Sequence, residues 1–578
     1  MPGARRANSP KPRDPAPPAT PAAGADTDTH LAAQLPRPSR GAHMTTWIHR
    51  RDEAEVDAEI ASATGPLAGL RLAVKDNVDV AGLPTTAACP DFAYTPDRDA
   101  PAVAALRAAG AVVAGKTNLD QFATGLVGTR SPYGVVENAL RPGYVSGGSS
   151  SGSAVAVANG EADIAIGTDT AGSGRVPAAL HGLVGIKPTV GVISTEGVVP
   201  ACRSYDCVTI FAADLRTADR AMGAMAAGAP GRPWPADARL AAPPQPVVAI
   251  FSELPDLDAQ WHTAFERTVA RLRDLGASIV EIDATPFLAA AKLLYGGALV
   301  AERYAAVGEF VDAHPESVDP TVGSIIRAAR DLPAHQLVTD LAALERLRAT
   351  AMASLAGVDA LLTPTTPTHP TIAEVAADPI AVNSRLGTYT NFCNLFDLCA
   401  VAVPTDEPHF GVTVLARAFE DAVAIDIAAL ITGTEFEDSC WPATVAPTQN
   451  LVVFGAHLRG QPLEHQLTTL GARWHGPVET APHYRLGALD TVPPKPAVTR
   501  VPATESGVAV AGERWLLSPA ALGRFLASLP APMQLGAVEL ADGTWHTGFG
   551  CAGAAAESAK DISEYGGWKA ALAAGAAG

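Results

Sequence analysis

Three residues, Lys75, Ser149 and Ser173, have the types and local contexts needed to turn a serine into a nucleophile. A serine attacks a carbonyl carbon efficiently only when a base removes its proton. A lysine can act as that base when burial and its neighbours lower its pKa towards neutrality. Lys75 lies in the apolar segment Arg71–Val80, where such desolvation is expected. The pattern therefore indicates covalent catalysis by a serine.

Two turns rich in glycine and serine, Ser146–Ser153 and Thr168–Arg175, each precede a predicted helix. Exposed backbone amides at such places bind anions. A phosphate-binding loop is one alternative, but neither turn ends in Gly-Lys followed by Ser or Thr. The nucleophile elbow of α/β-hydrolases is another, which Gly172–Gly174 nearly matches. Its spacing differs, and no compelling Asp-then-His order follows.

The stretch from Leu70 to Ala213 resembles the amidase-signature family. The resemblance is carried by three motifs, at Ala73–Asn77, Gly147–Ser153 and Gly167–Arg175. It implies that Ser173 is the nucleophile and that Ser149, after a cis peptide bond, relays its proton to Lys75. Without the other motifs, Lys75 would be interpreted as an ordinary strand residue, and Ser149 would be interpreted as the cap of the following helix.

The same resemblance implies two further roles for the second turn. Its backbone amides would form the oxyanion hole, namely those of Thr170, Ala171, Gly172 and Ser173. Asp169 and Arg175 would pair with each other and support the loop. No metal and no organic cofactor is implied.

Within that family the chain is most similar to the allophanate hydrolases, over Leu119–Gly134, Val198–Phe211 and Thr388–Pro404. The implied substrate is allophanate, which is urea carrying a carboxylate. We expect Arg303 to bind the carboxylate. Tyr295 precedes it by eight positions, about two helical turns, so both could face one pocket. By resemblance, Gly125 and Tyr295 line the substrate site.

The segment from Leu451 to Leu572 resembles the second domain of allophanate hydrolases, which is similar to γ-glutamyl-cyclotransferase-like folds. The matching pieces are Val452–Leu463, Ala481–Leu486 and Tyr565–Trp568. In that family, cleavage of allophanate gives ammonia and N-carboxycarbamate, which this domain helps to decarboxylate. His457 is the candidate acid or base. His483 and Tyr484 are weaker candidates.

The elements that would position these residues predict an α/β fold with a mixed, mostly parallel sheet and helices outside it. Predicted helices cover Asp52–Ala63, Ala102–Ala109, Leu119–Thr124, Ala154–Ala158, Trp261–Leu275, Leu288–Val307 and Leu337–Leu355. Predicted strands cover Arg71–Val80, Ala111–Ala114, Asp163–Gly167, Ala360–Leu362, Ala400–Val403 and Leu451–Phe454.

Three regions are expected along the chain. Residues 1–43 are rich in Pro, Ala and Arg and predict a disordered extension without a secretory signal. Residues 44–445 form the amidase-signature domain, and the loop-like stretch Pro442–Gln449 marks a boundary. Residues 450–578 form a smaller α+β domain.

Composition limits the partners. The net charge of −18 argues against a nucleic-acid binder, and no apolar run predicts a membrane span. The seven scattered cysteines favour free thiols in the cytoplasm. The resemblance suggests a homodimer and a functional link to a urea carboxylase. Alternatives left open are a general amidase, a glutamine amidotransferase subunit and an amidase-like scaffold without activity.

Overall fold

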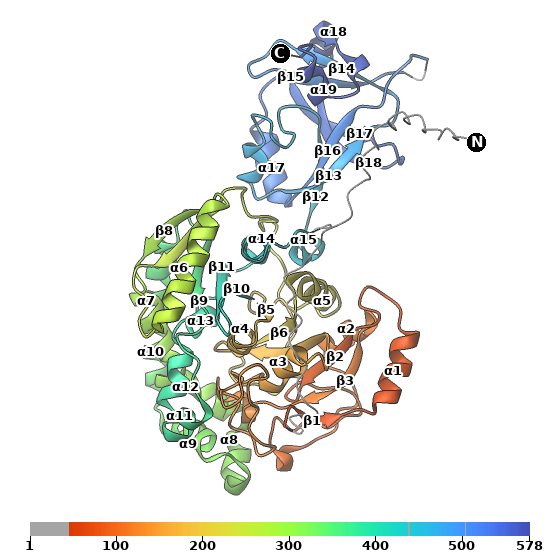
Figure 1. The fold of residues 1–578 in the computed structure, drawn as a ribbon. Helices are drawn as coiled ribbons and strands as arrows, with labels where there is room; N and C mark the ends of the chain where they lie inside the picture. Colours follow the sequence, from red (N-terminus) through yellow and green to blue (C-terminus); the bar gives the residue numbers. More distant parts are fainter. Residues whose placement is uncertain (1–44, 437–439, 503, 578) are drawn as a thin grey trace, which may run out of the picture. The chain divides into compact units, whose positions relative to one another are not determined.

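An eleven-stranded sheet forms the centre of the first part of the chain (Figure 1). The computed structural model describes residues 45–436, 440–502 and 504–577, so the predicted extension at residues 1–43 lies outside the described residues. In spatial order the strands are β1 (Trp47–Arg50), β3 (Val112–Thr117), β2 (Arg71–Lys75), β4 (Ile164–Asp169), β6 (Cys207–Ala212), β5 (Val184–Lys187), β10 (Cys399–Pro404), β11 (Gly411–Ala416), β9 (Ala360–Pro364), β7 (Val247–Phe251) and β8 (Ser278–Ile282).

The sheet is mixed, as expected, but the prediction that it is mostly parallel is wrong. Parallel pairing joins β2 to β3 and β4, and it joins β7 to β8 and β9. Between these groups the strands β4, β6, β5, β10, β11 and β9 pair antiparallel. For β10 and β11 the cause is the short connection between Pro404 and Gly411, because a tight link can join only antiparallel neighbours.

Strand β2 is shorter than the predicted segment Arg71–Val80, because the chain turns directly after Lys75. The amide of Val78 donates to the carbonyl of Lys75 at 2.9 Å, which closes that turn. Lys75 is therefore the last residue of a buried strand whose neighbours β3 and β4 run parallel to it. The carboxyl ends of parallel strands are where α/β sheets place their sites.

Most helices lie near their predicted positions. The longer ones are α1 (Glu53–Ser62), α2 (Pro101–Ala108), α3 (Ser151–Ala158), α5 (Leu215–Gly228), α6 (Ala259–Asp274), α7 (Thr285–Gly296), α8 (Ala301–Ala313), α9 (Pro320–Ala328), α10 (Ala334–Ser354) and α14 (Asp421–Thr432). Shorter ones are α4 (Val176–Leu180), α11 (Ile372–Ala377), α12 (Ala381–Leu386), α13 (Phe392–Leu395) and α15 (Trp441–Val445).

Two helix predictions are wrong. The helix predicted over Leu288–Val307 is split into α7 and α8, because Gly297 is extended and ends the first helix. The helix predicted over Leu119–Thr124 is only a three-residue 3₁₀ turn, within which Phe122 has a φ of 51°. The amide of Phe122 donates instead to Ala87 at 3.0 Å, so a contact with a distant segment replaces the helical hydrogen bond.

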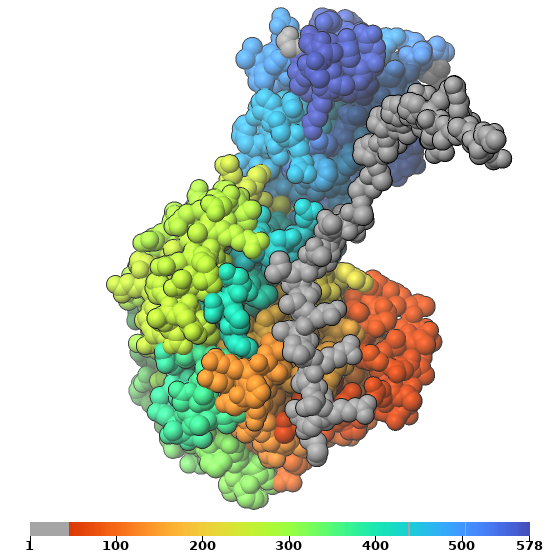
Figure 2. All heavy atoms as spheres, viewed as in Figure 1, coloured from red at the N-terminus to blue at the C-terminus, as the bar shows by residue number. Residues whose placement is uncertain are grey.

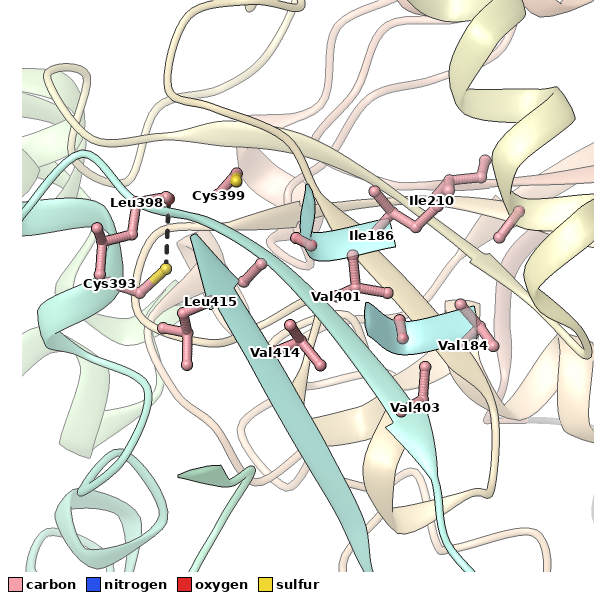
Figure 3. Packing of buried hydrophobic residues seen from close by; sticks show 14 of the residues in the cluster. Val184, Ile186, Ile210, Cys393, Leu398, Cys399, Val401, Val403, Val414 and Leu415 are labelled. Atoms are coloured by element: carbon pink, nitrogen blue, oxygen red, sulfur yellow. Dashed lines mark hydrogen bonds between the residues drawn. The ribbon is translucent and has the colours of Figure 1, made fainter. Parts of the chain in front are cut away.

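The central strands are packed by β-branched and leucine side chains. Val184 and Ile186 of β5, Val401 of β10 and Val414 of β11 lie together in one buried cluster (Figure 3). These strands are buried on both faces and read as continuous apolar runs, so periodicity alone does not give their direction. In the same view, Figure 2 shows the side chains of the yellow and green segments packed closely against one another.

The second part of the chain has its own two sheets and its own core, as expected for an α+β domain. One sheet has the order β13 (Arg473–Glu479), β16 (Ala511–Leu517), β12 (Gln449–Val453), β18 (Trp545–Cys551), β17 (Met533–Glu539). The other has the order β15 (Lys495–Arg500), β14 (Tyr484–Leu489), β19 (Lys560–Asp561). The α-helices that the structure describes beside them are α16 (His465–Thr468), α17 (Pro519–Ala527), α18 (Gly553–Ser558) and α19 (Trp568–Ala573). Among the described residues, no helix combines the length and the apolarity needed to cross a bilayer.

Candidate active site

The fold brings Lys75, Ser149 and Ser173 to neighbouring strand ends. Lys75 ends β2, and Ser173 lies in the turn between β4 and α4. Ser149 lies two residues before α3, after a Gly148–Ser149 peptide bond that is cis, as the family resemblance implied. All three side chains are buried. Ser149 does not cap α3, because the N-cap residue is Ser150 and makes no side-chain cap hydrogen bond.

Lys75 is the centre of a short hydroxyl network. Its Nζ lies 2.8 Å from Ser149 Oγ and 2.7 Å from Thr168 Oγ1. Asn77 Nδ2 lies 3.5 Å from the same Thr168 hydroxyl and donates to the carbonyl of Val199 at 3.3 Å. Sequence reasoning did not single out Thr168. Within the described part of the chain, no hydrogen bond joins Ser173 Oγ to Ser149.

Burial lowers the pKa of Lys75 from its ordinary value to about 7. Three buried carboxylates, those of Asp120, Asp206 and Asp169, act in the opposite direction, and the charge of Arg303 adds slightly to the lowering. A lysine with a pKa near neutrality is partly unprotonated at physiological pH and can accept a proton. The base expected from the apolar strand is therefore physically available.

The turn that carries Ser173 is fixed by a buried ion pair. Arg175 Nε and Nη2 donate to the two carboxylate oxygens of Asp169, both at 2.9 Å, which confirms the expected pairing. The fork-to-fork geometry fixes direction as well as distance. Asp169 also accepts from the amides of Gly172 at 2.8 Å and Gly174 at 3.1 Å. One charge pair thus sets the path of the whole turn.

The expected oxyanion donors divide into two kinds. The amide of Gly172 donates to Asp169 and is therefore engaged within the loop. The amides of Thr170, Ala171 and Ser173 make no hydrogen bond with any other described residue. Gly172 has a φ of +129°, and a Cβ there would lie 2.4 Å from Thr390 Oγ1. Only glycine fits this position, which lets the loop approach Thr390 closely.

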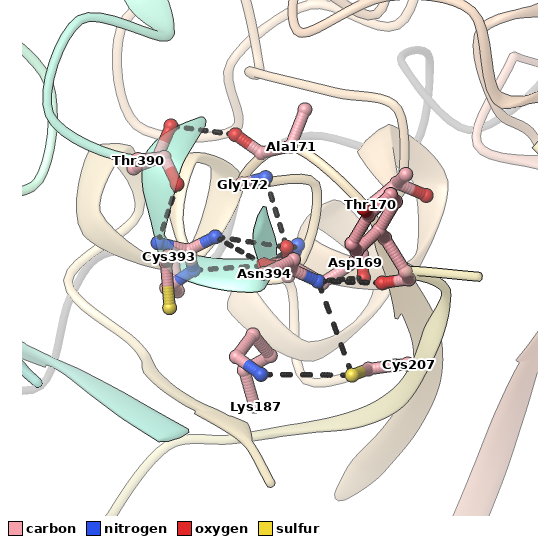
Figure 4. A network of polar contacts seen from close by, with 12 residues as sticks. Asp169, Thr170, Ala171, Gly172, Lys187, Cys207, Thr390, Cys393 and Asn394 are labelled. Atoms are coloured by element: carbon pink, nitrogen blue, oxygen red, sulfur yellow. Dashed lines mark hydrogen bonds and ion pairs between the residues drawn. The ribbon is translucent and has the colours of Figure 1, made fainter. Parts of the chain in front are cut away.

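Residues distant in sequence hold the same loop from outside. Thr390 Oγ1 donates to the carbonyl of Ala171 at 2.7 Å, and Asn394 Nδ2 donates to the carbonyl of Asp169 at 2.8 Å (Figure 4). Thr170 Oγ1 donates to Asp206, which also accepts from the amides of Ala201 and Cys202. No spacing in the sequence indicated these contacts.

Arg303 and Tyr295 do meet, although not along one helix as expected. Arg303 Nη2 donates to Tyr295 Oη at 3.2 Å, across the break between α7 and α8. Arg303 Nη1 donates to Thr124 Oγ1 at 3.0 Å and to the carbonyl of Ala123 at 3.3 Å. Arg303 is only 3% exposed, yet no carboxylate among the described residues forms an ion pair with it. A buried guanidinium whose hydrogen-bond partners are all neutral favours the binding of an anion.

Gly125 lies in a loop organised by the buried carboxylate of Asp120. This carboxylate accepts from the amides of Val127, Gly128 and Arg130 at 3.0–3.1 Å. A Cβ at Gly125 would lie 2.6 Å from Asp120 Oδ2, so this position excludes a side chain. Its neighbour Thr124 contacts Arg303, which brings the three expected substrate residues into one region.

His457 lies in a separate small cavity of the C-terminal domain. Its Nε2 donates to Gln466 Oε1 at 2.9 Å, which leaves Nδ1 as the unprotonated nitrogen of the neutral ring. Its ring stacks on Phe549 at 4.9 Å, and burial lowers its pKa. Tyr484 has a structural partner instead, since its hydroxyl accepts from the amide of Glu539 at 2.8 Å. His483 is exposed.

Two family models match the chain. The Amidase model covers residues 42–424, and the model named Allophanate hydrolase C-terminal domain covers residues 449–573. The urea amidolyase of Saccharomyces cerevisiae is 42% identical over 548 residues, which are 88% of this chain and 30% of that protein. The chain thus spans less than a third of the length of the curated relatives it matches first.

Two solved structures are similar over nearly the whole chain. The allophanate hydrolase of Kluyveromyces lactis has a TM-score of 0.82 and 38% identity, and the match covers 91% of this chain and 93% of that one. The urea amidolyase of Kluyveromyces lactis has a TM-score of 0.83 and 38% identity, and the match covers 94% of this chain and 35% of that one.

Proposed function

This chain belongs to the amidase family and carries an allophanate hydrolase C-terminal domain, and on that premise we propose that it hydrolyses allophanate. The observation that carries the proposal is Arg303. It is a buried cation without an acidic partner among the described residues, beside Tyr295 and the loop of Gly125. A neutral or long apolar substrate would offer this guanidinium no direct ionic partner, whereas the carboxylate of allophanate would pair with it.

In the proposed reaction, Lys75 is neutral and takes the proton of Ser173 through Ser149. Ser173 attacks the amide carbon of allophanate, and the developing oxyanion is stabilised by the free amides of Thr170, Ala171 and Ser173. The amide of Gly172, already bound to Asp169, keeps these donors in place. Ammonia leaves, and water then hydrolyses the acyl-enzyme to give N-carboxycarbamate.

Thr168 has a supporting role in this scheme. Its hydroxyl lies 2.7 Å from Lys75 Nζ and occupies one position around the nitrogen. Ser149 occupies another, at 2.8 Å. Two fixed partners hold the lysine nitrogen in the orientation needed for proton transfer. A fixed orientation lowers the barrier more than flexible contacts of the same kind do.

The C-terminal domain is proposed to assist the decarboxylation of N-carboxycarbamate, with His457 as its candidate acid or base. The overall products are then ammonia and bicarbonate. The urea amidolyase relatives support a functional link to a urea carboxylase that makes allophanate. A cytoplasmic location and a homodimer complete the proposal.

The test is ammonia release from freshly prepared allophanate by the purified full chain. Wild type and Ser324→Ala, a serine exposed on α9, should release ammonia at equal rates. Ser173→Ala should release none above background, because it lacks the nucleophile. If wild type cleaves simple neutral amides and leaves allophanate intact, the proposed substrate is wrong. If it cleaves neither, the chain is an amidase-like scaffold.

A further inference from the structure

Helix α10 buries an aspartate on a face that is otherwise apolar. The buried residues of this helix are Asp340, Leu344 and Ala351, whose spacing places them on one face. Asp340 is only 6% exposed, and no ion pair joins it to a basic residue in the part of the chain that the structure describes. A buried carboxylate is costly unless hydrogen-bond donors compensate for the lost water. The donors around Asp340 therefore indicate what the residue does.

Two donors hold this carboxylate. The amide of Ala298 donates to Asp340 Oδ2 at 2.7 Å, and Gln336 Nε2 donates to Asp340 Oδ1 at 3.1 Å. Ala298 is the first residue of the 3₁₀ turn Ala298–Val300, which leads directly into α8. The residue before it, Gly297, supplies no side-chain cap. Asp340 thus caps the start of this helical segment from another helix, and its negative charge is favourable at a helix N-terminus.

The capped segment is the break between α7 and α8. Gly297 is extended there, with a φ of −110° and a ψ of −175°, and its amide donates to the carbonyl of Leu293 at 3.1 Å. A Cβ at Gly297 would lie 2.9 Å from Asp340 Oδ2 and 2.7 Å from the carbonyl oxygen of Leu293. The break therefore depends on a close approach of the carboxylate to the backbone, which only glycine permits.

The two residues expected to recognise the substrate carboxylate lie on either side of this break. Tyr295 is near the end of α7, Arg303 is in the first turn of α8, and Arg303 Nη2 donates to Tyr295 Oη at 3.2 Å. In one continuous helix these two residues would be about 12 Å apart along the axis, because each residue adds about 1.5 Å. The extended Gly297 and its contact with Asp340 instead determine how α8 leaves α7, and therefore where the guanidinium lies relative to the hydroxyl.

We propose that Asp340 is a positioning residue for recognition of the substrate carboxylate. It acts through the amide of Ala298, and it thereby keeps α8, together with Arg303, in a fixed orientation towards Tyr295. This inference rests on the proposed function, in which Arg303 binds the carboxylate of allophanate. A fixed guanidinium binds a planar carboxylate better than one whose helix is free to shift, because less conformational freedom is lost on binding.

The test compares the kinetics of the purified full chain on allophanate and on biuret, its neutral amide analogue. Asp340→Ala should raise KM for allophanate about tenfold, change kcat less than about threefold and leave kcat/KM for biuret within about twofold, because only carboxylate recognition is loosened. Asp340→Asn keeps an oxygen that can accept from the amide of Ala298, and it should restore KM to within about threefold of wild type. Asp214→Ala removes an aspartate cap from α5 and is the matched control, which should leave the kinetics on both substrates unchanged.

Equal losses on both substrates in Asp340→Ala, or no loss on either, would overturn the inference and leave Asp340 with a role in stability alone. If Asp340→Ala does not fold, Gln336→Ala at an exposed position takes its place, because it removes one of the two donors to the carboxylate. This variant should raise KM for allophanate about twofold to threefold. An unchanged KM would overturn the inference in the same way.

Hydrogen exchange examines the helix break without any substrate. The amide of Ala298 should exchange at least about tenfold faster in Asp340→Ala and should be protected again in Asp340→Asn. Unchanged exchange in Asp340→Ala would contradict the inference. Arg303→Met, assayed on the same two substrates, separates the inference from the proposed function. If Arg303→Met keeps the wild-type preference for allophanate, the proposed function fails, whereas faster exchange in Asp340→Ala shows that the break still depends on Asp340.

Discussion

The amidase site and the C-terminal cavity differ in the polarity of the side chains that surround their candidate catalytic residues. Around Lys75 the walls are polar, with hydroxyls at hydrogen-bond distance and three buried carboxylates close enough to affect its pKa. Around His457 the walls are aromatic and aliphatic, and the lining residues include no acid. Nucleophilic attack needs a base that accepts the proton of the nucleophile and preorganised donors for the oxyanion. Loss of CO₂ is favoured instead where water is excluded. Each set of walls suits one step of the proposed reaction.

The largest difference between the two sites is expected in the variant Lys75→Met, which should affect the amidase site alone. Removing the base should lower the rate of ammonia release by about 10³-fold, within the range for loss of general-base catalysis. The exposed Lys292→Met on α7 serves as the control and should be unchanged. Release of ammonia at the wild-type rate by Lys75→Met would assign the base to another residue.

The pH dependence of kcat/KM tests the role of Lys75 as the base in a second way. Lys75 must be neutral to accept a proton, and its pKa is about 7 because of burial. Below that pH the protonated form accumulates, so kcat/KM for allophanate should fall about tenfold per pH unit. Ammonia release measured from pH 5 to 9 provides the profile. A flat profile through pH 6 would show that protonation of Lys75 does not limit the reaction.

A smaller effect is expected from Thr168→Val, which keeps the shape of the side chain and removes the hydroxyl beside Lys75. Loss of one buried hydrogen bond costs about 1–2 kcal/mol, so kcat should fall roughly tenfold. KM should change little, because Thr168 contacts the base and not the proposed carboxylate site. Thr350→Val on the exposed face of α10 is the control. A change confined to KM would assign Thr168 to substrate binding instead.

The smallest effect should come from Thr390→Val, which removes the hydrogen bond to the carbonyl of Ala171. The loop remains held by Asp169 and Arg175, so kcat should fall only about threefold to tenfold. CO₂ release from N-carboxycarbamate should be unaffected in the same variant. A fall of 10³-fold would mean that Thr390 and not the ion pair determines the loop.

The sequence predicted the residues that lie in continuous motifs and missed those brought in by the fold. Lys75, Ser149 and Ser173 each stand in a short recognisable segment, and so do Asp169 and Arg175. Asn394 contacts Asp169 across 225 positions, and Thr390 contacts Ala171 across 219. Such contacts depend on how strands β4 and β10 are placed in the sheet, which no local spacing records.

The predicted helices and strands show the same limit of sequence-based prediction. Apolar runs correctly located β9 and β10, but their direction depends on pairing partners and not on periodicity. The long apolar pattern over Leu288–Val307 concealed a break at Gly297, where the chain leaves the helix. Tyr295 and Arg303 nevertheless meet, because tertiary packing brings the two helices together.

The most direct measurement compares allophanate with biuret, in which a neutral amide replaces the carboxylate, in wild type and in Arg303→Met. Wild type should prefer allophanate by about 10²-fold in kcat/KM, as expected for a buried charge-assisted contact. Arg303→Met should bring this ratio close to one while retaining activity on biuret. An unchanged preference in Arg303→Met would contradict the account, because the carboxylate would then be recognised elsewhere.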